Sequence, residues 1–306
     1  MNKLDSDLLL EIANMKGTPK GAYNIRKNGG LEGRQNTEHL EIISKSDKPG
    51  IDIKIKPFTK GESVHIPVLV TQSGLNDLVY NDFFIGDYCD VDIIAGCGIH
   101  NDGHAKTQHD GVHTFHVGKH AKVRYVEKHY GEGSGDGDRV LNPQTIVYLA
   151  EGASITLDMV QIRGVDSTKR YTKVMADGAD SECVINEKLL TDGKQFAESR
   201  MEVVLNGVGA RTQVTSRSVG QDESTQVFYP QVEGNARCFG HVQCDSIIMG
   251  KAKISSIPAI VANDMEAQLI HEAAIGRIAG DQILKLMTLG LTEEEAEERI
   301  LIGFLE

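Results

Sequence analysis

Short β-favouring segments that alternate with turns at regular spacing constrain this chain more than any other feature. From about Ile51 onward, apolar and polar residues alternate in runs such as IDIKIKP, HIPVLVT, DVDIIAG and FHVGKHAKVRYVEK, separated by Gly, Asn and Asp. A small residue follows many of these turns, at spacings near one and two units of roughly 15 residues. These residues are Ala121, Ala153, Ala179, Ala210, Ser224, Ala236, Ala252 and Ala267. The pattern favours a solenoid of stacked coils, with a β-sandwich as the alternative.

The two ends of the chain differ from this middle part. LDSDLLLEIANM has apolar residues at helical spacing after Ser6, and a turn-rich connector follows. Near the other end, HEAAIGRIAGDQILKLMTLG contains good helix formers and stops at Gly290, while Thr292 and Glu295 form a capping box for a second helix. We therefore expect a helical and connecting segment over 1–50, a β-core over 51–268 and a helical segment over 269–306.

The two C-terminal helices are too small to bury both of their apolar faces against each other. The second of them carries an apolar stripe at helical spacing that includes Ala296, Ile300, Phe304 and Leu305. Packing against the end of the solenoid and docking of a partner protein both explain this stripe.

Charge and composition exclude several classes of function. The net charge of −12 argues against nucleic-acid or anionic-membrane partners. No apolar run is long enough for a membrane span, and Met1–Lys20 lacks a signal-peptide core, so we expect a cytoplasmic protein. GxxxxGK[ST], GxSxG and GxGxxG motifs are absent from the sequence. We expect no nucleotide on this chain, so any ATP hydrolysis that its function needs must come from another chain.

The cysteines are not arranged as a disulfide framework. There are five, no pair has CxxC spacing, and the count is odd. They are Cys89, Cys97, Cys183, Cys238 and Cys244. Each one is explained by default as a small buried hydrophobic residue.

Histidines concentrate in one stretch of the chain, which runs from His100 to His129. Seven of the eleven lie there: His100, His104, His109, His113, His116, His120 and His129. Imidazole is a common ligand for zinc and iron, but HExxH is absent and a cupin-like HxH followed by Glu does not occur. Histidines on turns and polar strand faces are the alternative to a metal site.

A second chemistry-bearing stretch contains Cys244, His271 and Glu272. The separation of Cys244 and His271 in the sequence is close to two of the repeat units, so adjacent coils of a solenoid could bring them together. Thiolate, imidazole and carboxylate are a plausible ligand set for iron or a sulfur precursor. One cysteine is too few for a complete cluster, but a symmetric dimer would double the set. A purely structural strand remains the alternative.

The C-terminal third resembles a known family. CDSIIMG, IPAI and HEAAIGRIAGDQILKLMTLGLTEEEAEERILIGFL are similar to the end of the SufB/SufD proteins, scaffold subunits of the SUF iron–sulfur cluster assembly system. VRYVEKHYGEG, LNPQT and QIRGVDSTKR extend the likeness back to about Ile66, especially to the short single-subunit forms of archaea and anaerobes.

The resemblance implies a mainly β fold, a right-handed parallel β-helix with helical ends. It also implies that two cores form a dimer whose interface assembles a transient iron–sulfur cluster for delivery to apo-proteins. The C-terminal helices are expected to dock an ABC-type ATPase, SufC. The residues that we expect to contact it are Leu284, Leu286, Met287, Ile300 and Phe304. The chain would then be a scaffold rather than an enzyme.

Residue by residue, the family's reactive cysteine falls on Cys244, and its HEA motif falls on His271 and Glu272. An acid that precedes this histidine in SufB is replaced here by Ile270, and one chain that carries both Cys244 and His271 suits a homodimer. The family's internal sulfur-accepting cysteine has no convincing counterpart, because GVHTFHV stands at that strand and Cys97 is a weak substitute. Free sulfide is therefore an expected sulfur source.

Two other functions remain open. A SufD-like structural subunit without cluster ligands would share the fold and the ATPase partner. The other is a β-helix enzyme, either metal-dependent or polysaccharide-processing. A polysaccharide-processing enzyme would need exposed carboxylates or a basic residue along a groove, and the missing signal peptide and the aromatic content of 5% disfavour it.

Overall fold

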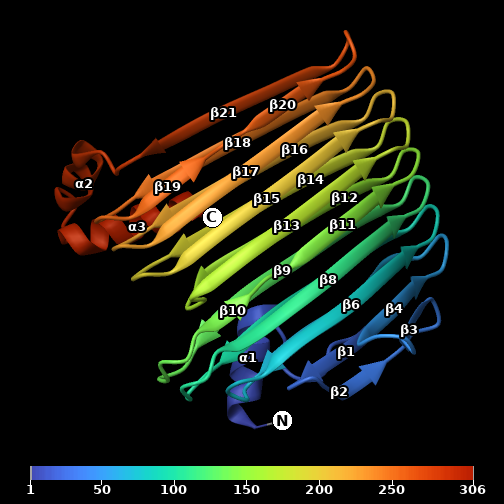
Figure 1. Cartoon of the computed structure of the whole chain (residues 1–306), viewed down its shortest axis with the longest axis horizontal. Helices are drawn as coiled ribbons and strands as arrows, with labels where there is room; N and C mark the ends of the chain where they lie inside the picture. Colours follow the sequence, from blue (N-terminus) through green and yellow to red (C-terminus); the bar gives the residue numbers. More distant parts are fainter. Residues whose placement is uncertain (1, 306) are drawn as a thin grey trace.

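The described chain is a parallel β-solenoid of about eight turns with short helices at its ends (Figure 1). The structure is a computed structural model and describes residues 2–305, with the side chain of Ile162 excepted. The mainly β, parallel β-helix fold expected from the sequence is confirmed. No helix in the described range is long and apolar enough to cross a membrane.

The helices are α1 (Lys3–Ala13), α2 (Gly280–Met287) and α3 (Glu293–Leu305). The strands of the first half are β1 (Ala22–Lys27), β2 (Gly30–Gln35), β3 (Leu40–Ser44), β4 (Gly50–Ile55), β5 (Lys60–Val70), β6 (Asn76–Ile85), β7 (Asp90–His100), β8 (Thr107–Val117), β9 (Lys122–Glu132), β10 (Arg139–Leu141) and β11 (Gln144–Leu149). Those of the second half are β12 (Ser154–Arg163), β13 (Ser167–Ala176), β14 (Glu182–Thr191), β15 (Phe196–Leu205), β16 (Arg211–Gly220), β17 (Thr225–Gly234), β18 (Phe239–Ile248), β19 (Lys253–Ser256), β20 (Ala259–Ala262) and β21 (Gln268–Gly276).

From β4 onward, successive strands alternate between two facing sheets, with β10–β11 and β19–β20 each counting as one interrupted strand. The order of the first sheet is β2-β1-β5-β7-β9-β12-β14-β16-β18-β21, and that of the second is β19-β17-β15-β13-β10-β8-β6-β4-β3 with β11 and β20 beside this path. Lys122 pairs with Ser154 and Ser154 with Glu182, so a full coil is about twice as long as the repeat unit of the sequence. That repeat unit is therefore half a coil, one strand and one turn.

The small residues after the turns are buried where a coil bends from one sheet to the other. Ala121, Ala153 and Ala210 are fully buried, because a larger side chain would enter the space between stacked coils. Ala179 and Ala267 differ: Ala179 is exposed, with Ser181 in the buried place two residues later, and Ala267 on the last coil is half-buried. The repeat thus predicted the corners of the solenoid with one error of register.

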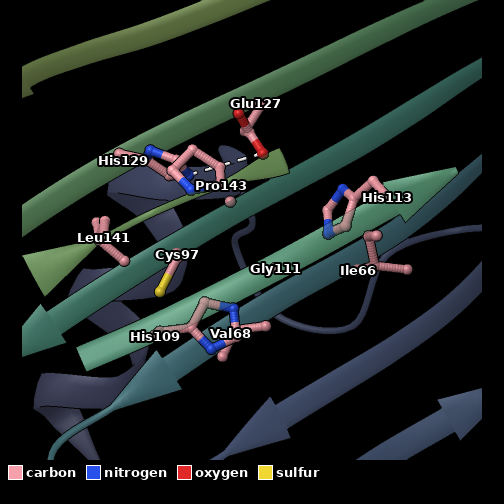
Figure 2. Close-up of a pocket in the computed structure, with 11 residues that line it drawn as sticks. Ile66, Val68, Cys97, His109, Gly111, His113, Glu127, His129, Leu141 and Pro143 are labelled. Carbon is pink, nitrogen blue, oxygen red and sulfur yellow. Dashed lines mark ion pairs between the residues drawn. The ribbon is translucent and has the colours of Figure 1, made fainter. Parts of the chain in front are cut away.

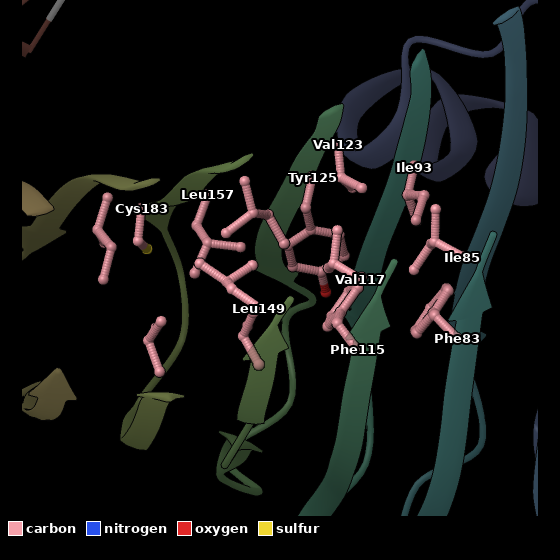
Figure 3. Close-up of a cluster of buried hydrophobic side chains, with 14 of the residues drawn as sticks. Phe83, Ile85, Ile93, Phe115, Val117, Val123, Tyr125, Leu149, Leu157 and Cys183 are labelled. Carbon is pink, nitrogen blue, oxygen red and sulfur yellow. The ribbon is translucent and has the colours of Figure 1, made fainter. Parts of the chain in front are cut away.

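Apolar side chains from both sheets fill the inside of the solenoid (Figure 3). Phe83 and Phe115 stack on neighbouring strands with ring centroids 4.3 Å apart, and Tyr125 of the opposite sheet meets Phe115 edge-on at 4.9 Å. Full burial of an aromatic ring of this size contributes about 1.5–3 kcal/mol. The alternation of buried and exposed residues along each strand follows from the pleat.

Helix α1 covers the outer face of β5, β7 and β9. Leu8 and Ile12 pack there against Gly96 and Gly98 of β7. Glycine is needed at position 96 because a Cβ there would lie 2.6 Å from the Ile12 carbonyl oxygen. The helix begins at Lys3, ahead of the expected start after Ser6, because Asn2 caps it and shares a capping box with Asp5.

Two segments differ from the sequence-based expectation. The range 1–50 was expected to be helical or connecting, but strands β1–β3 lie there and pair with the edges of the two sheets. The helix expected from His271 onward is a strand as far as Gly276, because β21 pairs with β18 residue by residue and this pairing overrides the helix propensity of Ala273 and Ala274. The helical segment starts only at α2.

The last two helices follow the sequence signals more closely. Thr292 and Glu295 form the expected capping box: the Glu295 carboxylate accepts from the Thr292 backbone N–H at 2.8 Å, and the Thr292 hydroxyl accepts from the Glu295 N–H at 3.2 Å. Helix α2 packs against α3, and α3 packs against β16. Both lie beside the final coils, at the opposite end from β1 and β2 (Figure 1).

Candidate functional site

A cysteine and a histidine meet where the solenoid ends. Cys244 on β18 points inward and is 2% exposed. Its Sγ lies 3.2 Å from Nε2 of His271, which belongs to β21, the last strand of its sheet. No further coil in the described part of the chain covers them, so the pair occupies the open end of the space between the sheets. We call this pair and its surroundings the mouth.

Strand alternation decides which residues face this mouth. His271 pairs with the buried Val242 and shares the inward face of β21 with Leu269. Glu272 is the next residue and therefore lies on the outer face, where its Oε2 is 3.3 Å from Nε2 of His241. Of the three ligands expected from the sequence, the structure brings Cys244 and His271 together and places Glu272 on the opposite side of the strand.

The structure brings together two side chains of types that ligate metals, Cys244 and His271. Among the described residues, no group of three or more His, Cys, Asp and Glu side chains has the arrangement needed to hold a metal ion. A tetrahedral site with sulfur and nitrogen ligands takes four. The pair alone is therefore too few for such a site.

Burial keeps both side chains of the pair uncharged. It raises the pKa of the Cys244 thiol to about 11, and the carboxylates of Glu187 and Asp245 add to this effect. Burial, with the nearby His241, lowers the pKa of His271. At neutral pH the site is therefore a thiol beside a neutral imidazole, and an arriving metal ion has to displace the thiol proton.

Behind Cys244 lies a small cavity of about 20 Å³ that is lined by several serine side chains together with apolar residues such as Leu189, Phe228 and Ile254. Glu187, Ser216 and Cys244 occupy one row across β14, β16 and β18. The Glu187 carboxylate accepts hydrogen bonds from Ser199 at 2.7 Å and from Ser216 at 2.9 Å. The buried carboxylate is thus satisfied without a contact to the thiol.

A second polar cluster lies deep inside the first half of the solenoid (Figure 2). Cys97, His109, His113, Glu127 and His129 line another cavity of about 20 Å³, and each is at least nine-tenths buried. We call them, together with Tyr125 and Arg170, the inner cluster. Coils cover it on both sides.

Hydrogen bonds and ion pairs satisfy the inner cluster. Arg170 Nη1 lies 2.5 Å from Glu127 Oε2, and the Tyr125 hydroxyl donates to Oε1 of the same carboxylate at 2.9 Å. Because this hydroxyl proton is committed, Nδ1 of His113, 2.6 Å away, carries the hydrogen and donates to the Tyr125 oxygen. Arg170 also donates to Nδ1 of His129 at 3.3 Å.

The charges of the inner cluster are fixed by this network. Burial lowers the pKa of His113 and of His129 to about 4. Burial opposes ionisation of Glu127, yet His129 and Arg170 lower the pKa of its carboxyl to about 2. Burial also raises the pKa of Cys97 well above its usual value. The thiol is therefore protonated, and the Glu127–Arg170 ion pair is buried beside the neutral imidazoles of His113 and His129.

The histidine-rich stretch is divided between the inside and the outside. His109, His113 and His129 face inward. His100 contacts Asp102 at 2.8 Å, and His116 stacks on Phe84 at 5.1 Å on the outer face. Arg170 and Glu187 were not predicted as buried residues. The signal was the alternation of side chains along STKRYTKV and ECVINEKLL, which places both of them between the sheets.

The residues expected to bind a partner lie on α2 and α3. Helix α2 buries none of its residues, and Leu284 and Met287 are 62% and 39% exposed. Leu286, Ile300 and Phe304 are half-buried. The unburied apolar residues are therefore concentrated on α2, while α3 packs on the sheet.

Comparison with known proteins gives one consistent family. Residues 84–304 match the model of the SufBD core domain of SUF-system iron–sulfur cluster assembly. An iron–sulfur cluster assembly SufBD family protein of Methanocaldococcus jannaschii is 27% identical over 290 residues, which cover 94% of this chain and 90% of that protein. One from Archaeoglobus fulgidus is 26% identical over 274 residues, with 88% and 71% covered. A chloroplastic one from Arabidopsis thaliana is 26% identical over 204 residues, with 64% and 36% covered.

Proposed function

The chain belongs to the SufBD family of iron–sulfur cluster assembly proteins, and on that premise we propose that it is a scaffold subunit on which a nascent cluster is built. The observation that carries the proposal is the contact of 3.2 Å between Cys244 Sγ and His271 Nε2 at the mouth. A soft thiolate and an imidazole are ligands that suit iron. Iron and sulfide are the cargo of this site.

We propose that two copies join mouth to mouth as a homodimer. The last coil is uncovered, and its exposed apolar residues need a partner surface. They are Ile257, Ile260, Val261, Met265, Ile270 and Ile275. A twofold axis through this end would bring two copies of Cys244 and His271 together and supply four protein ligands. Glu272 and His241, on the outer face beside the pair, would lie at the rim of that interface.

The chemistry of the mouth follows from its protonation. The thiol has to lose its proton when it binds iron or sulfur, while His271 is already neutral and offers its Nε2 lone pair. Burial of the thiol keeps it unreactive until metal or a movement of the last coil lowers its pKa. The site thus holds cargo only when assembly begins.

We propose that the movement is driven by an ABC-type ATPase docked on α2 and α3. Helix α2 has an unburied apolar face, and the chain has no P-loop of its own. Since α3 packs on β16, next to β18, a pull on these helices would reach the coil that carries Cys244. The completed cluster would pass to recipient apo-proteins in the cytoplasm, and the chain itself would be no enzyme.

A structural subunit that binds no cluster is the second candidate. It is favoured by the small ligand set, because one chain presents a pair and not a complete site in its described part. In that case a different family member would supply all of the cluster ligands.

Anaerobic reconstitution with ferrous iron and sulfide separates the two candidates. The scaffold proposal predicts that the wild-type chain binds both and shows thiolate-to-iron absorption, and that Cys244→Ala loses it. Cys238→Ala is the matched control, because Cys238 is buried on the same coil without a histidine partner. Equal reconstitution of Cys244→Ala and wild type would remove Cys244 from the site, and no reconstitution of wild type would favour the structural subunit.

A further inference from the structure

One serine at the mouth has a buried hydroxyl without a hydrogen-bond partner. Ser256 is the last residue of β19, which lies at the edge of the second sheet. Its Oγ atom is buried and forms no hydrogen bond of normal geometry with the described residues 2–305. An unpaired buried hydroxyl costs free energy, so its presence in a folded chain needs an explanation.

Strand pairing turns Ser256 toward the inside of the solenoid. It pairs with Phe228 of β17, whose side chain belongs to the buried core. The preceding residue, Ser255, pairs with Val227 and is exposed, because neighbouring side chains of a strand point to opposite faces. Ser256 and Cys244 line the same cavity, and they come from opposite sheets.

The other inward-facing serines of this cavity have partners. Ser199 and Ser216 both donate to a buried carboxylate, at 2.7 Å and 2.9 Å. Ser218 and Ser246 form a hydrogen bond with each other, at 2.8 Å between their Oγ atoms. Ser256 differs from these four because its oxygen has no partner at all. Its proton is therefore available to an acceptor that appears in the cavity.

The Cys244 sulfur is such an acceptor once it has become a thiolate. Burial raises the pKa of this thiol most, and the carboxylates of Glu187 and Asp245 raise it further, whereas the approach of the Ser256 hydroxyl to the sulfur lowers it. A hydroxyl that donates to a thiolate forms a charge-assisted hydrogen bond, which is stronger than one to a neutral group. Contacts of this kind are often poorly aligned in an empty site and tighten when the charge develops.

We propose that Ser256 is a positioning residue that donates a hydrogen bond to the Cys244 sulfur in its thiolate state. The hydroxyl is in place before the charge exists, and the hydrogen bond satisfies it when the charge develops. On a metal-bound thiolate, the same hydrogen bond orients the sulfur and withdraws electron density from it. The purpose of this role rests on the proposed function, but the contact itself needs no iron.

The rate at which iodoacetamide alkylates Cys244 in the native chain at pH 7 tests this role, since the thiolate is the reacting species. Ser256→Ala should react about threefold more slowly than wild type. Loss of the hydrogen bond lowers the thiolate fraction about tenfold, and the higher nucleophilicity of the remaining thiolate restores about half of this loss on a logarithmic scale. Mass spectrometry follows Cys244 and Cys238 in the same samples, because a loosened structure would speed up the reaction of both.

Two further variants separate the hydroxyl from the packing around it. Ser256→Thr keeps the hydroxyl and should react at the wild-type rate. Ser246→Ala is the matched control, because it removes a hydroxyl of the same cavity that already has a partner, and it should also leave the rate at Cys244 unchanged.

Three results would overturn the proposal. They are a Ser256→Ala rate equal to or above that of wild type, an equal slowing in Ser246→Ala, and a Ser256→Thr rate as slow as that of Ser256→Ala. None of these measurements uses iron or sulfide. Failure of this role is therefore distinguishable from failure of the scaffold proposal, which anaerobic reconstitution tests.

Discussion

The inner cluster and the mouth contain the same kinds of side chain and differ in how many coils cover them. Histidine, cysteine and carboxylate groups occur in both. In the inner cluster, Glu127 is held by Arg170 and Tyr125, and the charges are fixed. At the mouth, Cys244 lies against His271, and the described chain adds no further coil.

The comparison teaches that position along the solenoid decides whether such residues are structural or available for chemistry. Coils on both sides let a polar residue find partners in neighbouring strands, as Arg170 does with Glu127 and Glu187. The last coil offers partners on one side only. Under the proposed function, the pair at this end would be completed by cargo and by a second chain.

The largest effect is expected in the inner cluster. Arg170→Met should lower the free energy of unfolding by about 3–5 kcal/mol, because it leaves the Glu127 carboxylate buried without its charge partner. Urea unfolding at pH 7 measures the change. The double variant Arg170→Met with Glu127→Leu should recover much of the loss, and a single variant as stable as wild type would show that the ion pair does not hold this region.

The pH dependence of stability tests the same cluster. The folded-state pKa values of His113 and His129, about 4, lie below the usual value of 6.5, so the unfolded chain binds more protons between these limits. Their contribution is complete above pH 6.5 and declines as the pH falls toward 4, by up to about 3 kcal/mol for each imidazole.

Urea midpoints at pH 7 and pH 4.5 measure this decline. His113→Gln should show a smaller decline than wild type over this interval, since one imidazole no longer titrates. Identical declines in the two proteins would contradict the account of a neutral buried His113.

A smaller difference between the inner cluster and the mouth is expected in the reactivity of their thiols. Cys97 and Cys183 are enclosed by coils, whereas Cys244 lies at the open end. Alkylation of the native chain with iodoacetamide should label Cys244 before these two, and its rate should rise with pH because the thiol pKa is about 11. Mass spectrometry identifies the sites, and earlier labelling of Cys97 would reverse the proposed difference between the two regions.

The smallest effect on stability is expected at α2. Leu284 is 62% exposed, so Leu284→Ser should change the free energy of unfolding by less than about 0.5 kcal/mol. The same variant should lower co-purification with an ABC-type ATPase from the same organism. Lys285→Ser is the control on the same helix, and unchanged co-purification of Leu284→Ser would exclude this face as the docking site.

Much of this organisation could be predicted from the sequence. Strand periodicity and the small residues at turns left a solenoid and a β-sandwich open, and the resemblance to SufB/SufD decided for the solenoid. The same resemblance selected Cys244 and His271, which the structure places in contact. The position of Glu272 follows from alternation, but only once His271 is known to lie in a strand. The helix propensity of HEAAIG hid this, because pairing with β18 is a long-range contact.

The inner cluster could not be predicted in the same way. Arg170 lies 43 residues from Glu127 in the sequence, and the contact depends on the register of several coils. The histidine count drew attention to this region without showing which histidines face inward. Burial and pairing, which set the charges there, are properties of the stacked coils.

The central claim is that two mouths meet and bring two copies of Cys244 into one site. Mild oxidation of a variant in which Cys89, Cys97, Cys183 and Cys238 are replaced by alanine tests it most directly. The account predicts a disulfide-linked dimer on non-reducing electrophoresis that is absent when Cys244 is also replaced. A chain that stays unlinked while sedimentation shows it to be dimeric would contradict the account.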